Sequence, residues 1–473
     1  MSIKHKGLKP QSKHKHHTFQ RDLTAPTLTL LTIGGIMGSG LFLASGLAIR
    51  SAGPVILIFF GVAVVAMYFE ITALAEMSVA TPSPGSFLVY TEKVLGPGWT
   101  FVSGWIFWFS SVLTMSSEVT AAALFTKFWF PGVALWIWSL VYSALIIGVN
   151  FLSVRGFGTI EDVMAGVKTL AVALFLAVGI GALLHILPAS AHTHLSMNPL
   201  IDITAHGGWL PHGWLAAAPT MLLVLFAYAG TGVIGLAAAE SKSPAKVIPT
   251  AVRSTSIIVF VLYLGSIFLI LSLMPWNRYV PNVSPFTIAL KSVSVPGAAF
   301  AMNLVLLFAV LSTMNAALYS NVRVLYRLAK DHQAPPWLGK LNAKGQPAFA
   351  ILASAGLLAF TIGLAYALPK QAYAYLVTAT GFQAMFIWLM VLLTQLKYRP
   401  YLQKHHPHHL KYRQLGFPVS TILVMVFVIM AMGFAFLAKG ELVGVVVGIG
   451  VIGLTWAVWI LFGHRIIRHH GAG

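Results

Sequence analysis

The chain contains no cysteine and few charged side chains. Only 9% of its 473 residues are charged, with 30 Lys and Arg against 11 Asp and Glu, whereas 58% are hydrophobic. A soluble globule needs about 25% charged residues to face water, so this composition excludes a soluble enzyme and a disordered protein. The lack of cysteine excludes a disulfide-stapled secreted scaffold. Lipid must solvate much of the surface, and we infer an all-α polytopic membrane protein.

Long apolar runs are abundant, and about twelve of them reach the roughly 20 residues that a membrane-spanning helix requires. Alternation of apolar and polar residues with period two is missing, which argues against a membrane barrel. The predicted spans are residues 24–48, 53–80, 98–126, 133–152, 158–186, 214–239, 251–274, 296–327, 347–367, 371–396, 417–437 and 442–463.

The basic residues indicate how these helices are oriented. If the N-terminus lies inside, all but six of the 30 Lys and Arg fall on or near the inner side. Basic residues concentrate on the cytoplasmic side of membrane proteins, so both termini are predicted to be cytoplasmic in a multi-pass inner-membrane protein. The charges are split among several loops and form no stripe, so the expected partner is the lipid bilayer and not nucleic acid.

The spans predict a simple division of the chain. No loop exceeds about 30 residues, so we expect no separate soluble domain. The predicted segments are a basic cytoplasmic tail (1–23), a first five-helix repeat (24–186), an extracellular loop (187–213), a second, inverted five-helix repeat (214–396), a cytoplasmic loop (397–416), helices 11 and 12 (417–463) and a cytoplasmic tail (464–473).

Two glycine clusters lie in the middle of spans: GGIMGSG over 34–40 and AGTGVIG over 229–235. Each glycine costs a helix about 1 kcal/mol relative to alanine. Either cluster alone also fits a close helix-packing surface. Because the clusters occupy the first helix of two successive sets of five, they favour an inverted-repeat transporter with a site at the bilayer midplane.

Interrupted helices suit a zwitterionic ligand. The N-terminus of a half-helix leaves N–H groups for a carboxylate, and the C-terminus of another leaves carbonyls for an ammonium group. Such backbone survives in a membrane only where it lines a cavity. An amino acid meets both demands better than a sugar does.

Several motifs resemble those of bacterial amino acid permeases of the amino acid–polyamine–organocation superfamily, in the amino acid transporter family. They occur in the family's order over nearly the whole chain. They include GGIMGSGLF (34–42), PSPGSF (82–87), GPGW (96–99), EVTAA (118–122), AAAES (237–241), LAKD (328–331) and QAP (333–335).

This resemblance implies a leucine-transporter-like fold of five helices, an inverted copy of five, and two more. It also implies proton-coupled or proton-assisted amino acid uptake, with no cofactor. By motif position, the substrate carboxylate would lie against Gly38, Ser39 and Gly40 of the first helix. The amino group would meet the break in the sixth helix, at Phe226, Ala227, Ala229 and Gly230.

One departure from the family pattern affects the expected substrate. Many relatives carry a glutamate shortly after the glycine of the sixth-helix break, where this chain has Gly232. A cationic substrate would need a buried acidic partner, so we expect a neutral amino acid.

Ionisable residues inside spans are functional candidates by default. Lys168 is either a lysine snorkelling to the cytoplasmic surface or, as the resemblance implies, an ammonium group beside the first-helix break in place of a sodium ion. Glu118 is either a proton carrier or a tie to another helix. Glu240, at the end of the sixth helix, is expected to act in a cytoplasmic gate or ion pair. Glu70 and Glu76 are expected to pair with loop cations.

Enzyme signatures are missing, because the chain has no phosphate-binding loop, no HExxH motif and few carboxylates. We therefore expect no catalytic residues and no metal site. Dispersed histidine clusters, such as His405–His409, fit a solvated basic edge, and a pH or metal sensor is the alternative. The lead hypothesis is a secondary amino acid permease; an exchanger of the same fold and an amino acid sensor remain alternatives, and the oligomeric state stays open.

Overall fold

The structure is helical throughout the part of the chain that it describes. This computed structural model describes residues 23–83, 85–152, 154–187, 199–237, 240–241, 243–342, 345–368, 371–438 and 442–470. In these ranges the only β-pairing is an isolated bridge between Leu23 and Ser241. The predicted tail over 1–23, apart from Leu23, and residues 188–198 of the predicted outer loop lie outside the described residues.

The first half of the chain forms one broken helix followed by four long ones, with a short helix between the second and third. Its elements are α1 (Ala25–Ile36), η1 (Gly40–Ala44), α2 (Ser45–Ala52), η2 (Gly53–Val55), α3 (Ile56–Ala80), α4 (Phe87–Leu95), α5 (Pro97–Thr126), α6 (Leu135–Leu152) and α7 (Val154–Leu183).

The second half repeats this order, and two further helices follow it. Its elements are α8 (Pro199–Thr204), α9 (Trp214–Ala217), α10 (Thr220–Ala227), α11 (Val233–Ala237), α12 (Pro244–Leu273), η4 (Trp276–Arg278), α13 (Pro285–Lys291), α14 (Ala298–Lys330), η5 (Pro336–Gly339), α15 (Ala348–Ala367), α16 (Ala372–His405), η6 (Pro407–His409), α17 (Val419–Phe434), η7 (Ala435–Leu437) and α18 (Leu442–His470).

The all-helical polytopic class is confirmed. Among the described residues, 7 helices are long and apolar enough to cross a membrane, and four shorter apolar helices also fall on predicted spans. The 30-residue α5, rich in serine and threonine, occupies another predicted span. The number of twelve crossings stays a prediction.

Several helices extend beyond the predicted spans, because hydropathy marks the membrane and not the end of a helix. α12 begins at Pro244, earlier than the predicted residue 251, and α16 continues to His405 through the predicted cytoplasmic loop. Likewise, α18 continues to His470 through the predicted tail. The polar residues beyond each apolar run still favour helix, since Lys, Arg, Gln and Leu are good helix formers.

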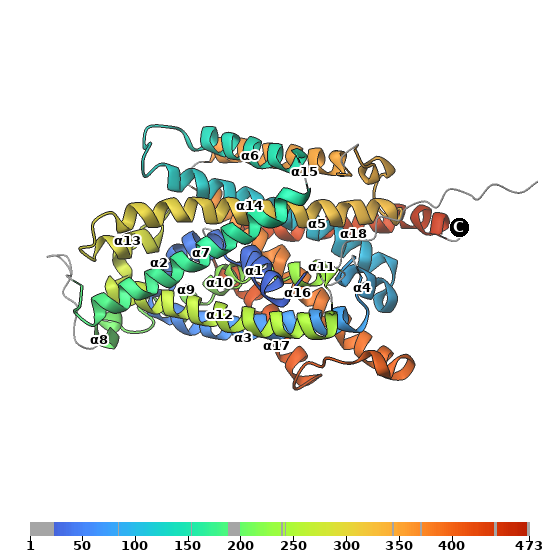
Figure 1. Cartoon of the computed structure of the whole chain (residues 1–473), viewed down its shortest axis with the longest axis horizontal. Helices are drawn as coiled ribbons and strands as arrows, with labels where there is room; N and C mark the ends of the chain where they lie inside the picture. Colours follow the sequence, from blue (N-terminus) through green and yellow to red (C-terminus); the bar gives the residue numbers. More distant parts are fainter. Residues whose placement is uncertain are drawn as a thin grey trace, which may run out of the picture.

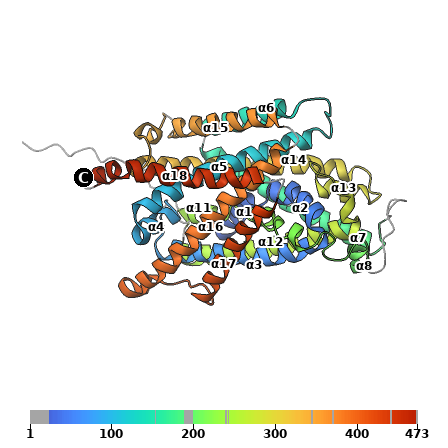
Figure 2. The same cartoon turned by 180° about the vertical axis from the view of Figure 1, so that it is seen from behind.

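Corresponding helices of the two halves pack against each other. Figures 1 and 2 show α3 beside α12 on one side of the bundle and α6 beside α15 on the opposite side. Between them, α5 packs along α14. The short helices α4 and α13 also occupy matching places, each between the second and third long helix of its half. This pairing is the arrangement that an internal repeat produces.

The two broken helices meet at the centre of the bundle and pair in opposite directions. α1 packs on α11, while η1 and α2 pack on α10 (Figure 1). The N-terminal half of the first broken helix therefore contacts the C-terminal half of the second, and the reverse. Glycine permits the close approach: a Cβ atom on Gly230 would lie 2.7 Å from the carbonyl carbon of Gly35.

Gly230→Ala should destabilise the protein, since Gly230 has φ +103° and no room for a Cβ. We expect a loss of roughly 1–3 kcal/mol from backbone strain alone, measured as a lower thermal unfolding temperature of the purified protein in detergent. Gly232→Ala is the matched control, because its Cβ would meet only Phe107, at 3.6 Å. Equal melting temperatures for the two variants would contradict this account.

Candidate substrate site at the helix breaks

The first break places opposite charges at opposite half-helix ends. α1 ends at Ile36, and its last carbonyls carry the partial negative charge of a helix C-terminus. Lys168 of α7 donates to two of these oxygens, Gly34 O at 2.6 Å and Met37 O at 3.2 Å. Thr313 of α14 lies 2.8 Å from Met37 O and bonds to it as well. Lys168 thus supplies the hydrogen bonds that these carbonyl oxygens need, because the bilayer core holds no water to bind them.

Lys168 is only 1% exposed, which excludes a side chain that snorkels to the surface. Its ammonium group also donates to the hydroxyls of Ser312 and Thr313, at 3.2 and 3.3 Å. The predicted position beside the first-helix break is confirmed. Its role in coupling stays a prediction.

On the other side of the break, Glu118 of α5 binds the start of the second half-helix, which begins with η1. Its carboxylate accepts hydrogen bonds from the Ser39 N–H, at 2.9 and 3.1 Å, and from the Ser39 hydroxyl at 3.0 Å. Ser39 is the N-cap of η1, where the helix dipole favours an anion. Of the two roles expected for Glu118, the tie to another helix is therefore present.

Two tyrosines that sequence reasoning missed bind backbone at the breaks. The Tyr263 hydroxyl lies 3.2 Å from Ile36 O and 3.1 Å from Ala227 O, so it links the two broken helices. The Tyr373 hydroxyl donates to Ser39 O at 2.9 Å. Both residues sit in ordinary apolar helical patterns, and nothing in the sequence distinguishes them from core tyrosines.

A cavity of about 110 Å³ opens beside the two breaks and extends along the halves of α3, α5 and α14 that lie nearest α4. Backbone of both breaks lines it, through Gly38, Gly40 and Gly230. The remaining walls are apolar and hydroxyl side chains, and the only ionisable residues in the described lining are Glu70 and Glu118. A mostly apolar cavity with a few convergent polar groups is the usual form of a small-molecule site.

Most of the predicted substrate residues line this cavity, but two do not. Gly38, Gly40, Phe226, Ala229 and Gly230 are in its wall. Ser39 stays a predicted ligand; in this conformation its N–H and hydroxyl both donate to Glu118.

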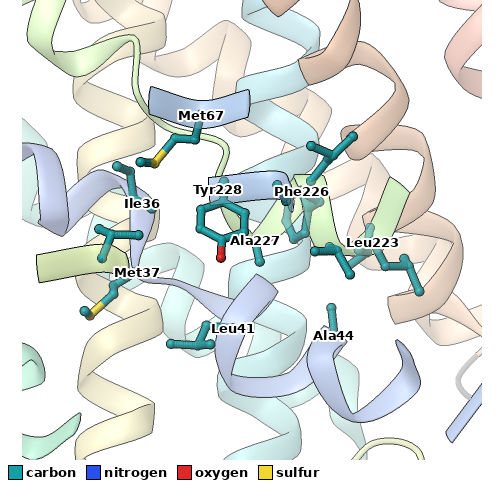
Figure 3. Close-up of a cluster of buried hydrophobic side chains, with 14 of the residues drawn as sticks. Ile36, Met37, Leu41, Ala44, Met67, Leu223, Phe226, Ala227 and Tyr228 are labelled. Carbon is teal, nitrogen blue, oxygen red and sulfur yellow. The ribbon is translucent and has the colours of Figure 1, made fainter. Parts of the chain in front are cut away.

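Ala227 likewise stays a prediction, and it does not belong to the cavity wall in this conformation. Its carbonyl accepts from Tyr263, and its backbone packs on Gly40. Figure 3 shows Tyr228 between Ile36 and Phe226, next to Ala227. The Tyr228 hydroxyl donates to Phe60 O at 2.9 Å, outside the cavity.

Glu70 corrects two expectations. It is 1% exposed and lines the cavity, whereas we expected it to pair with a loop cation. The second expectation was that Gly232 leaves the sixth-helix break without an acid; Glu70 supplies a carboxyl group there from α3, next to Thr231. The expected pairing holds for Glu76, which contacts Arg399 at 3.3 Å and accepts from the Gln414 N–H.

The end of the sixth helix is held by an ion pair, as expected for Glu240. Its carboxylate contacts the Arg323 guanidinium of α14 at 2.9 Å. The backbone carbonyl of Glu240 accepts from the Leu23 N–H at 3.1 Å. These contacts join the start of the first broken helix, the end of the second broken helix and α14 at one end of the bundle.

The remaining polar candidates have local roles. Asn150 donates to the side chain of Asn315 at 2.7 Å, and this bond joins α6 to α14. His405 stacks on Tyr401, and the ring of His406 lies tilted beside it. Among the described residues, no group of three or more His, Asp or Glu could hold a metal ion. The histidine clusters near residues 14 and 192 fall outside the described residues.

Solved structures show which fold this is. The chain resembles the manganese transporter of Eremococcus coleocola, with a TM-score of 0.55 at 12% identity over 97% of both chains. A mutant form of the same protein gives a TM-score of 0.59. The fold is therefore that of leucine-transporter-like membrane transporters, with two broken helices at its centre, as expected.

Sequence comparison then identifies the family. Residues 27–469 match the family described as Amino acid permease, and the chain belongs to it. YtnA, an uncharacterized amino acid permease of Bacillus subtilis, is 35% identical over 86% of this chain and 87% of its own. The gamma-aminobutyric acid permease of that bacterium is 32% identical over 96% and 94%. The L-asparagine permease of Streptomyces coelicolor is 33% identical over 88% and 84%. The chain is thus a transporter and not an enzyme.

Tyr263→Phe should weaken substrate binding, because it removes the hydroxyl that links both breaks. One hydrogen bond contributes about 1 kcal/mol, so we expect about fivefold weaker binding of the amino acid that the wild-type protein prefers. Isothermal titration of the detergent-purified protein measures this. Tyr279→Phe, which removes a bond to Ile270 O away from the site, should leave affinity unchanged. Equal affinities for the two variants would show that the Tyr263 hydroxyl does not contribute to substrate binding.

Proposed function

We propose that this permease is a secondary active transporter that imports amino acids across the cytoplasmic membrane, coupled to protons, by alternating access. The observation that carries the proposal is the pair of helix breaks. They bring residues of both broken helices, among them Gly38, Gly40 and Gly230, to the wall of one cavity at the centre of the bundle. Family membership supports the substrate class.

The preferred substrate in this proposal is a neutral amino acid. The named relatives include permeases for gamma-aminobutyric acid and for asparagine, both of which carry no net charge at neutral pH. No Lys, Arg or His occurs in the described cavity lining, so an acidic side chain would find no cation there. In the proposed pose the substrate carboxylate lies against Gly38 and Gly40, and the amino group faces Phe226, Ala229 and Gly230.

Proton coupling is proposed through Lys168. A lysine in low-dielectric surroundings loses its proton more readily than one in water. Deprotonation would release the carbonyls of Gly34 and Met37 and loosen the end of α1, and reprotonation would restore them. Glu118, on the far side of the same break, is the proposed partner in this cycle.

Orientation and gating complete the proposal. The excess of basic residues on the predicted inner side supports a cytoplasmic position for both termini. The cavity then extends toward the cytoplasmic side. The Glu240–Arg323 pair lies on that side, so it acts as a cytoplasmic gate that must part when substrate leaves.

Uptake into proteoliposomes tests the function. An inward proton gradient should drive accumulation of neutral amino acids from a labelled panel of neutral, cationic and anionic ones. Sodium should have no effect, because Lys168 occupies the place of a cation, and a protonophore should abolish accumulation. Strongest accumulation of a cationic amino acid would contradict the proposed preference for a neutral substrate. Exchange without net uptake would indicate an exchanger, and binding without movement would indicate a sensor.

Lys168→Ala should retain part of the substrate binding but lose proton-driven accumulation, because no titrating group remains at the end of α1. Binding and uptake are measured side by side on the same preparation. Lys127→Ala, at the opposite end of α5 from the gate, is the control and should behave as wild type. Normal gradient-driven uptake by the Lys168 variant would remove this residue from the coupling mechanism.

A further inference from the structure

Glu70 is a buried carboxyl group in the cavity wall, and no described residue gives it a charged partner. It is 1% exposed, and its Oε2 atom has no hydrogen-bond partner. Its one polar contact is the hydroxyl of Thr231, in the break between α10 and α11. Sequence reasoning assigned it a structural ion pair, and the transport cycle proposed above does not use it.

The elements around Glu70 supply no cation. In the described cavity lining, α4, α11, α14 and α16 contribute apolar and hydroxyl side chains only. The only other titratable group there is Glu118, whose carboxylate is held by Ser39. Further along α3, Glu76 is paired with Arg399, so that arginine is already engaged. Lys168 binds the carbonyls of α1, and Arg253 of α12 is exposed to solvent.

A desolvated carboxylate without a cation is strongly disfavoured. Such a group in a membrane carries a proton or takes a cation from a ligand. The cavity gives access for both, since Glu70 forms part of its wall. If backbone carbonyls bind the amino group of a zwitterionic substrate, the Glu70 carboxyl group remains free to exchange its proton.

We infer that Glu70 is a proton-binding residue of the transport cycle, which takes up and releases one proton as the cavity changes access. It acts next to the sixth-helix break, where Gly232 replaces the acid of many relatives. Glu70 brings a carboxyl group to this break from α3, beside Thr231. This inference rests on the proposed function and adds a second proton-binding residue to it, so that both Lys168 and Glu70 are needed for coupling.

Glu70→Gln tests the inference, because glutamine keeps the shape and the contact with Thr231 but cannot release a proton. A proton gradient of one pH unit corresponds to about 1.4 kcal/mol. The coupled entry of one proton per substrate molecule therefore drives about tenfold accumulation of the substrate. The variant should lose this accumulation and keep counterflow of labelled substrate, at a rate that no longer depends on pH. Glu92→Gln on α4, outside the cavity, is the control and should accumulate as wild type does.

A second variant moves the acid back to the sixth helix. Gly232 has room for a side chain, since its Cβ would meet only Phe107 at 3.6 Å, and it lines the same cavity. The double variant Glu70→Gln/Gly232→Glu should regain gradient-driven accumulation. Such a rescue separates proton binding from a structural role of Glu70, which a carboxyl group on another helix would not replace.

The outcomes separate this inference from the proposed function. If the wild-type protein accumulates no amino acid under a proton gradient, the proposed function fails before Glu70 is tested. If wild type and Glu70→Gln both accumulate, the inference alone is overturned. It is also overturned if Glu70→Gln loses binding at every pH, because the carboxylate would then be a ligand for the substrate's amino group. Lost coupling with intact counterflow and rescue by Gly232→Glu supports it.

Discussion

Backbone polar groups freed by the two helix breaks must find partners inside the protein, because the bilayer core holds no water to bind them. At the first break a cation meets the carbonyl end of one half-helix and an anion meets the N–H end of the next. Lys168 binds Gly34 O and Met37 O, and Glu118 binds Ser39. Each charge offsets the half-helix dipole that it faces, and each side chain comes from a different long helix.

These contacts also connect the broken helices to the rest of the bundle. Tyr263 of α12 reaches both breaks, and Tyr373 of α16 reaches Ser39. At Gly40 and Gly230 the two backbones approach so closely that side chains would collide. A rearrangement of one broken helix must therefore alter the contacts of the other. This coupling suits a transporter in which a central site opens to each side in turn.

The sequence predicted the helical architecture well and the helix ends poorly. The apolar runs and the glycine clusters located nearly every long helix, including the breaks in the first and the sixth. The short helices α4 and α13 were missed because seven to nine residues give no clear hydropathy signal. The ends of α16 and α18 were missed because their last turns are polar yet helical.

In the site, the sequence located the glycines, Lys168, Glu118 and Glu240, since glycine clusters and intramembrane charges are rare enough to stand out. It did not anticipate the contact of Ser39 with Glu118 or the place of Glu70 in the cavity wall, because both depend on helices remote in the chain. The sequence shows which charged residues and glycines are energetically unfavourable inside a membrane helix. It therefore indicates that the charged side chains need a partner in the folded protein. Which partner it finds is set by how α3, α5 and the broken helices pack. Only the tertiary structure could therefore turn Ser39 toward Glu118 and leave the Glu70 carboxyl group facing the cavity.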